Sequence, residues 1–261
     1  MRDSPWRDSG PAQELHQAYR LHSLQAALHE REISQALSLL QSAGVEPILG
    51  KGWAMARLYP ESGLRPYGDL DLYVRPEQHS RARQVIEAPD GRVVDLHRGF
   101  DGLDDRDPGE ILRRSQLLDR EGPAVRVFGV EDHLRLVCLH MLRHGVLRPL
   151  WLCDVAVALE SRPASFDWAY FAAGRPCRTE WVGCALLLAH DLLGARLDGV
   201  PAAIATRRRP RWLAPTVLRE WGRGRPPHGA RTPMAYFLSH PAEVLEVSRA
   251  LVLRWPNGIE A

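Results

Sequence analysis

The chain has 261 residues, of which 45% are hydrophobic and 25% charged, a composition typical of a globular protein with one large domain or two smaller ones. The net charge of +2 gives no reason to expect nucleic-acid binding from charge alone. The N-terminal segment is polar and charged, unlike a signal peptide, and no apolar run has membrane-spanning length. We therefore expect a cytoplasmic protein that does not enter a membrane.

The N-terminal region, residues 1–44, has a helical pattern after a short polar arm. Apolar side chains recur at helical spacing in two stripes, one from Leu15 to Leu28 and one from Ile33 to Leu40. Gly44 follows as a residue suited to end a helix. We predict N-terminal helices that pack on the domain that follows.

A glycine turn closes the first predicted strand, which begins at Glu46. The turn reads Gly50-Lys51-Gly52 and opens a short predicted helix over residues 52–59. Glycines let a phosphate come close to the backbone, and the start of a helix offers N–H groups to it. Lys51 is also the only lysine of the chain. The turn therefore predicts a binding site for phosphate groups.

Arg65 lies between that helix and the next predicted strand. Arginine is a good partner for phosphate. Pairing at the surface with an acidic neighbour, Glu61 or Asp69, is an equally good interpretation.

Two carboxylates share one face of the next predicted strand. Successive side chains of a strand alternate between its faces, so Asp69 and Asp71 lie opposite to the apolar residues that alternate with them. Taken alone, such a pair more often belongs to a turn or a solvated surface. However, two like charges this close repel each other, and a cation such as Mg²⁺, which binds carboxylates and phosphates, would remove the repulsion.

A third aspartate lies on the strand predicted for residues 92–97, after a helix over about residues 76–87. Alternation puts Asp95 and His97 on the face opposite to the apolar residues of that strand. If the two strands are neighbours, three aspartates converge, and two metal ions could hold a triphosphate and an attacking oxygen in line.

The C-terminal half is predicted to be helical. Residues 99–110, rich in Gly and Asp, are predicted as a solvated loop, and a short strand is expected at residues 124–128. Helices are expected at residues 131–144, 149–160, 166–172, 176–193, 201–207, 211–222 and 242–254. We divide the chain into an N-terminal arm and helices (1–44), an α/β core (45–128) and a helical domain (129–261).

Two histidines, His140 and His144, share one face of the helix predicted for residues 131–144, and Asp154 on the next helix could meet them. One interpretation is recognition of an acceptor or base. The other is a hydrogen bond between helices that buries Asp154 with a histidine partner. The basic run at residues 207–211 would suit an RNA acceptor, but a solvated helix end is the commoner interpretation.

The four cysteines, Cys138, Cys153, Cys177 and Cys184, lie in apolar segments predicted to be helical. None forms a Cys-x-x-Cys pair, so we expect reduced thiols in the core rather than a zinc site.

Three segments together resemble the uncharacterised bacterial nucleotidyltransferase family of the DNA polymerase β-type superfamily: the run from Leu49 to Pro60, the run from Leu64 to Val74, and Val94-Asp-Leu-His-Arg98. The match keeps order and spacing over residues 48–98 and continues more loosely to about residue 220. It departs from the wider superfamily at the turn, where Gly-Ser or Gly-Gly is usual, and in the short stretch 75–94, where a longer helix and an extra strand are normal.

The resemblance implies an α+β fold with a small mixed sheet, in which Asp69, Asp71 and Asp95 bind two Mg²⁺ ions, or Mn²⁺ in their place. It implies a nucleotidyltransferase that moves a nucleoside monophosphate from an NTP, most readily ATP, to a hydroxyl acceptor with release of pyrophosphate. Gly50, Lys51, Gly52 and Arg65 would bind the nucleotide. His97, His140, His144 and Asp154 are candidates for the acceptor side.

The acceptor stays open among a small molecule, a peptide or protein, and a tRNA. Two other functions also remain. One is a catalytically silent nucleotide-binding or regulatory module of the same fold. The other is a small-molecule phosphotransferase, because the segment after Val94 resembles a kinase catalytic loop; no kinase-type glycine-rich loop precedes it.

Overall fold

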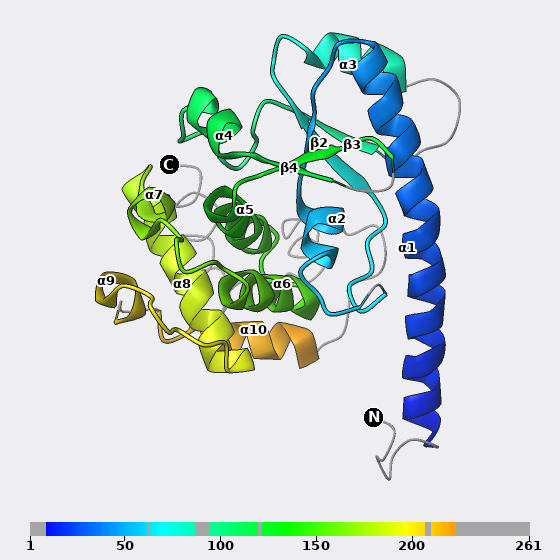
Figure 1. Ribbon diagram of the computed structural model, residues 1–261. Coiled ribbons are helices and arrows are strands. Elements are labelled where there is room, and N and C mark those ends of the chain that lie inside the picture. The colour runs from blue at the N-terminus through cyan, green and yellow to red at the C-terminus, as the bar shows by residue number, and fades with distance from the viewer. Residues whose placement is uncertain (1–8, 62, 87–93, 120–121, 207–209, 223–261) are drawn as a thin grey trace, which may run out of the picture. The chain divides into compact units, whose positions relative to one another are not determined.

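The computed structural model describes residues 9–61, 63–86, 94–119, 122–206 and 210–222, which form two compact units (Figure 1). The first unit holds the described residues up to Asp104 together with Pro108–Gly129. The second holds Asp105–Asp107 and the described residues from Val130 onward. The first unit contains a mixed sheet with helices and the second is helical where it is described, so the α+β class is confirmed.

The first unit contains, in chain order, α1 (Gly10–Ser42), β1 (Ile48–Leu49), α2 (Lys51–Ala56), β2 (Leu70–Val74), α3 (His79–Ile86), β3 (Val94–Arg98), α4 (Pro108–Arg114), β4 (Gln116–Leu118) and β5 (Val125–Val127). Its five strands lie in the order β3-β2-β1-β5-β4. The pairs β2–β3 and β1–β5 are parallel, and the other two pairs are antiparallel. The helix α3 connects the two parallel strands β2 and β3.

One face of this sheet is the hydrophobic core of the unit. The apolar residues of β2 pack there with the C-terminal half of α1, with Ala82 of α3 and with the two valines of β5. Figure 1 shows α1 as the long blue helix, with α3 beside its C-terminal end. The opposite face carries the side chains that alternate with the core residues, and these include Asp71 and Asp95.

Only the second apolar stripe of α1 is buried. Ile33, Leu37 and Leu40 are almost inaccessible, whereas Leu15 and Leu24 of the first stripe are mostly exposed. The helical period is the same along α1, but only its C-terminal part lies over the sheet core.

The predicted solvated loop at residues 99–110 is wrong in two respects. Phe100 and Leu103 are buried, and the side chain of Asp105 is 1% exposed. The helix α4 also begins within this segment, at Pro108. The strand β4 was not predicted, because it has three residues without a strong apolar pattern and lies at the edge of the sheet.

The second unit contains α5 (Val130–Arg143), α6 (Pro149–Glu160), α7 (Trp168–Ala172), α8 (Pro176–Leu193), α9 (Ala202–Ala205) and α10 (Leu213–Gly222). The helices α5, α6 and α8 pack pairwise around a core of leucine, valine and alanine side chains.

No disulfide joins the four cysteines, all of which are described. None of the described helices is both long and apolar enough to cross a lipid bilayer. The helix predicted at residues 242–254 and part of the basic run at residues 207–211 lie outside the described residues.

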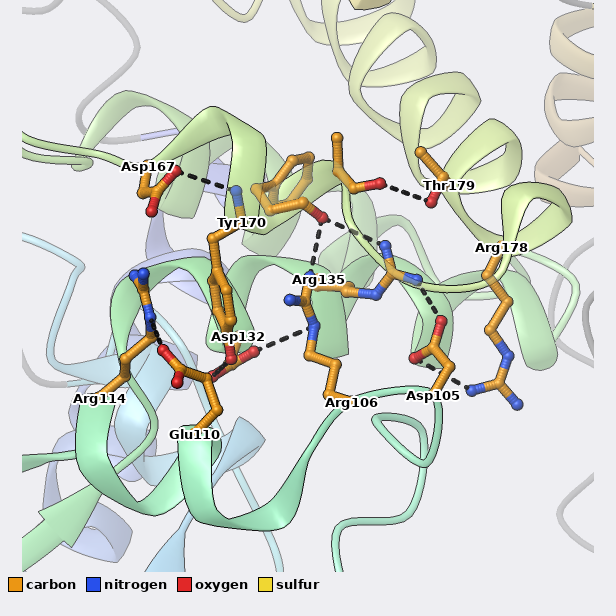
Figure 2. A network of polar contacts seen from close by, with 12 residues as sticks. Asp105, Arg106, Glu110, Arg114, Asp132, Arg135, Asp167, Tyr170, Arg178 and Thr179 are labelled. Atoms are coloured by element: carbon orange, nitrogen blue, oxygen red, sulfur yellow. Dashed lines mark hydrogen bonds and ion pairs between the residues drawn. The ribbon is translucent and has the colours of Figure 1, made fainter.

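A network of buried ion pairs and hydrogen bonds joins several helices of the second unit (Figure 2). The Asp105 carboxylate lies 2.6 Å from a guanidinium nitrogen of Arg135 and 3.6 Å from one of Arg178. Beside it, Arg106 Nε lies 3.2 Å from Asp132, which also accepts a hydrogen bond from the Tyr170 hydroxyl. The segment Asp105–Asp107 is thus joined to α5, α7 and α8 by ion pairs and hydrogen bonds.

A second group of contacts completes this network. Both Arg106 and Arg135 donate hydrogen bonds to the backbone carbonyl of Phe171, at 2.9 and 3.2 Å. The guanidinium of Arg106 also lies 4.1 Å from the centre of the Tyr170 ring. Buried charges of this kind are stable only when each has partners, so every member depends on the others.

Candidate functional site

The register between β2 and β3 brings two of the predicted acids together. Asp71 is paired directly with Asp95 across these parallel strands, so both side chains lie on the face of the sheet opposite to the core. The side chain of Asp71 is 7% exposed, whereas that of Asp95 is 53% exposed. Asp69 precedes β2 by one residue and its carboxyl group feels the charge of both other acids.

Two basic side chains lie directly on these acids. His97 Nε2 lies 3.2 Å from Asp71 Oδ1 and 3.2 Å from Asp95 Oδ2. Lys51 Nζ lies 2.7 Å from the same Asp71 Oδ1. The His97 ring stacks on Tyr73, with ring centroids 4.2 Å apart, and this stacking fixes the imidazole against the acids.

The pKa values show which acids this arrangement favours as carboxylates. Burial alone would raise the pKa of Asp71, but the hydrogen bond from His97 and the charge of Lys51 outweigh it and lower the pKa to about 2. The hydrogen bond from His97 also lowers the pKa of Asp95. Burial and the charges of Asp71 and Asp95 raise the pKa of Asp69. Burial opposes protonation of His97, yet its hydrogen bonds to the two acids raise its pKa.

The glycine turn lies against the strand that carries the acids. Gly50 N donates a hydrogen bond to the carbonyl of Asp71 at 3.0 Å. A Cβ atom on Gly50 would lie 2.8 Å from a ring carbon of Tyr73 and 3.0 Å from one of Phe128. Neither ring can give way easily, because Tyr73 is held between His97 and Phe128. Glycine is therefore required at position 50 by close packing.

The second glycine of the turn also faces the site. A Cβ atom on Gly52 would lie 3.3 Å from the carbonyl oxygen of Asp69 and 3.7 Å from a guanidinium nitrogen of Arg65. Arg65 is 8% exposed, so it is not a surface residue, and it donates a hydrogen bond to the carbonyl of Pro66 at 3.2 Å. The predicted nucleotide-binding residues are thus neighbours of one another and of the acids.

Replacing Gly50 by alanine should lower the free energy of unfolding by about 1–3 kcal/mol, because the added methyl group must displace the Tyr73 ring and with it His97. Denaturant unfolding measures the effect. Gly68→Ala is the matched control, since a Cβ atom there would meet no other atom within 4 Å. Equal stability of the two variants would contradict the packing argument.

One group among the described residues has the donor geometry of a metal site: Asp71, Asp95 and His97, whose ligand atoms all lie within 4.8 Å of one another. Two carboxylate oxygens suit Mg²⁺ and Mn²⁺, and an imidazole nitrogen adds a ligand that Mn²⁺ accepts more readily than Mg²⁺. Asp69 is outside this group. His97, a candidate for the acceptor side, lies between two of the acids.

The other acceptor-side candidates lie in the second unit. The rings of His140 and His144 are 4.6 Å apart, and both contact the indole of Trp151, at 5.0 and 5.3 Å. Asp154 is 2% exposed. These contacts are internal to the second unit, so an acceptor-side role for these residues stays a prediction.

Comparison with known protein families gives a match over most of the chain. The sequence profile of a family described as uncharacterised nucleotidyltransferase matches residues 2–90 and 87–194. A crystal structure of an antigenic nucleotidyltransferase-like protein from Paracoccidioides brasiliensis is 15% identical, with 75% of this chain and 95% of that chain covered and a TM-score of 0.40. At that TM-score the likeness supports no conclusion about this chain. Among curated proteins there is no significant match. Because the profile matches more than half of its residues, the chain belongs to this family of uncharacterised nucleotidyltransferases.

Proposed function

We propose that the chain transfers a nucleoside monophosphate from an NTP, with ATP the first donor to test, to a hydroxyl acceptor. The observation that carries the proposal is the register of β2 and β3, which sets Asp71 opposite Asp95 beside the Gly50-Lys51-Gly52 turn. Acids alone would bind cations, and a glycine turn alone would bind phosphates. Only their combination suits the triphosphate of a nucleotide together with its divalent cation.

Each residue has a role that follows from its position. Asp71 and Asp95, with His97, would hold a divalent cation, and Asp69 adds negative charge next to them. A bound Mg²⁺ or Mn²⁺ would supply neutralisation of the charge that builds up on the phosphate oxygens. Lys51 would contact the triphosphate, because its ammonium group already lies beside the acids.

The reaction is a substitution at the α-phosphorus. The acceptor oxygen forms a bond to that phosphorus, the bond from it to the α–β bridging oxygen breaks, and pyrophosphate leaves with the bonding electrons. Asp95 would take the proton of the acceptor hydroxyl, because its carboxylate is half exposed whereas that of Asp71 is buried. Small molecules, peptides or proteins, and tRNA all offer such a hydroxyl.

A second candidate function is a nucleotide-binding module without turnover. The ion pair between Lys51 and Asp71 favours it, because an internal cation already neutralises one of the acids. The presence of all three aspartates argues against this function, because a site that no longer needs turnover usually loses one of its acids.

The test is incubation of the protein and a cell extract with Mg²⁺ and each NTP in turn, followed by mass spectrometry and a pyrophosphate assay. We expect one acceptor to gain the mass of a nucleoside monophosphate, with pyrophosphate released in equal amount. Asp95→Asn serves as the inactive control. Release of a nucleoside diphosphate would point instead to a phosphotransferase, and the absence of any product with all NTPs would favour the silent module.

A further inference from the structure

The single lysine of the chain lies in the acid cluster, where most of its side chain is shielded from solvent. The Lys51 side chain is 13% exposed, and its ammonium nitrogen lies 2.7 Å from Asp71 Oδ1 and 3.4 Å from His97 Nε2. The same nitrogen lies 5.6 Å from the centre of the Tyr73 ring. The chain has 34 Lys and Arg residues, and all of them except Lys51 are arginines. A lysine at this position is therefore an exception within the sequence.

The backbone at Lys51 adopts a conformation that is unfavourable for a lysine. Its φ angle is +37°, in the left-handed region that favours glycine. The residue in this conformation is the lysine and not either of its neighbours, Gly50 and Gly52. Glycine would adopt that conformation without strain. The turn thus keeps a lysine where its backbone conformation is unfavourable and where its ammonium group reaches Asp71.

The ammonium group and a divalent cation would compete for one carboxylate. Asp71 belongs to the group of three residues with metal-site geometry, and its Oδ1 atom is the one that Lys51 contacts. A divalent cation and the ammonium group held by the same carboxylate would repel each other strongly at such short distances, because both are positively charged. Lysine is suited to yielding the position, because its charge is compact and its four-carbon stem is flexible.

We propose that Lys51 is the resident counter-ion of the acid cluster, and that a divalent cation displaces its ammonium group from Asp71 onto the triphosphate of the nucleotide. The displacement step rests on the Lys51–Asp71 contact and on the metal-site geometry of Asp71, Asp95 and His97, whereas the transfer to the triphosphate rests on the proposed function. Lys51 is a positioning residue in this scheme, because it couples the binding of metal and nucleotide. Metal alone binds weakly against the ammonium group, and metal with nucleotide binds more tightly.

Calorimetric titration of Lys51→Met separates this role from a structural one. With Mn²⁺ alone, the variant should bind about tenfold more tightly than the wild type, because a competing positive charge is gone. With a non-hydrolysable ATP analogue and Mg²⁺, it should bind about tenfold more weakly, because a phosphate ligand is gone. Arg57→Met, which removes an exposed positive charge just after the same short helix, should change neither affinity. A purely structural lysine would weaken both.

A direct readout uses the fact that the chain has one lysine. Reductive methylation with ¹³C-formaldehyde labels only Lys51 and the terminal α-amine. The modification keeps the positive charge of the lysine. Added Mg²⁺ should move the NMR signal of the Lys51 methyl groups to the position that this signal has in the Asp71→Asn variant, where the carboxylate partner is absent. The α-amine signal should not change.

The outcomes distinguish this inference from the proposed function. If Mn²⁺ binds the wild type and Lys51→Met equally and the methyl signal does not move, the counter-ion role is wrong while nucleotide transfer can still hold. If neither protein binds Mn²⁺, the counter-ion role fails together with the metal site. If Mg²⁺ moves the signal but no NTP yields pyrophosphate with any acceptor, the inference stands and the proposed function fails.

Discussion

Replacing Asp71 by asparagine is expected to abolish Mg²⁺-dependent binding of NTP and to lower any turnover by roughly a factor of 10³, the size of effect seen when one preorganised electrostatic group is removed from an active site. Asp71 is the acid that Lys51 and His97 both contact, and it belongs to the candidate metal-binding group. Asparagine keeps the shape of the side chain but has no charge to hold a cation.

Calorimetry with Mg²⁺ and each NTP measures this effect, and Asp69→Asn should reduce the affinity as well. The two variants differ in what they lose, because Asp69 lies outside the group of three ligands and contributes its charge alone. Asp191→Asn, which removes an exposed carboxylate from α8, is the matched control. Unchanged affinity for Mg²⁺ and NTP in both Asp69→Asn and Asp71→Asn would contradict the proposed site.

Side-chain alternation along two short strands was enough to predict which residues share the acid face. Alternation in β2 and β3 puts Asp71, Asp95 and His97 on one face, and the structure has them there. Two adjacent parallel strands joined by one helix then need only the right register to bring the acids together. That register, Asp71 opposite Asp95, depends on packing of the whole sheet and could not be read from local sequence.

The contacts of Lys51 and His97 with the acids could not be predicted from the local sequence either. The Lys51–Asp71 contact depends on a positive φ angle in the turn, a conformation that sequence alone does not predict for a lysine. His97 could be placed on the correct face but not between two carboxylates, since that position follows from the register and from stacking on Tyr73.

Helix ends were predicted well where a residue type signals them. Helices α6 and α8 begin at Pro149 and Pro176, because proline suits the first helical turn. Helix α8 ends just before Gly194, whose backbone has the left-handed conformation that often terminates a helix. The acid-rich segment around Asp105 was misassigned because acids usually lie in water. Its main partner, Arg135, is 30 residues away in sequence, so no local pattern announces the pair.

Replacing Asp105 by alanine should lower the free energy of unfolding by about 3–5 kcal/mol, which would be the largest effect on stability that we expect from a single substitution here. The carboxylate is 1% exposed and contacts Arg135, which is fully buried, as well as Arg178. It also accepts a hydrogen bond from the backbone N–H of Arg175 at 2.9 Å. Alanine leaves two buried guanidinium groups without this carboxylate, and the cost of a buried charge that lacks its counter-charge exceeds the value of the ion pair itself.

Denaturant unfolding followed by tryptophan fluorescence measures the loss, with Glu180→Ala, an exposed acid of α8, as a control expected to change stability by less than about 0.5 kcal/mol. The double variant Asp105→Ala with Arg135→Met tests the cause. Removing the guanidinium that lost its partner should restore part of the stability, because the penalty comes from the unpaired buried charge and not from the lost packing contacts of the carboxyl group. If the double variant were less stable than Asp105→Ala by the full effect of Arg135→Met alone, the two residues would not be coupled, and the segment Asp105–Asp107 would be held to the helices by its other contacts.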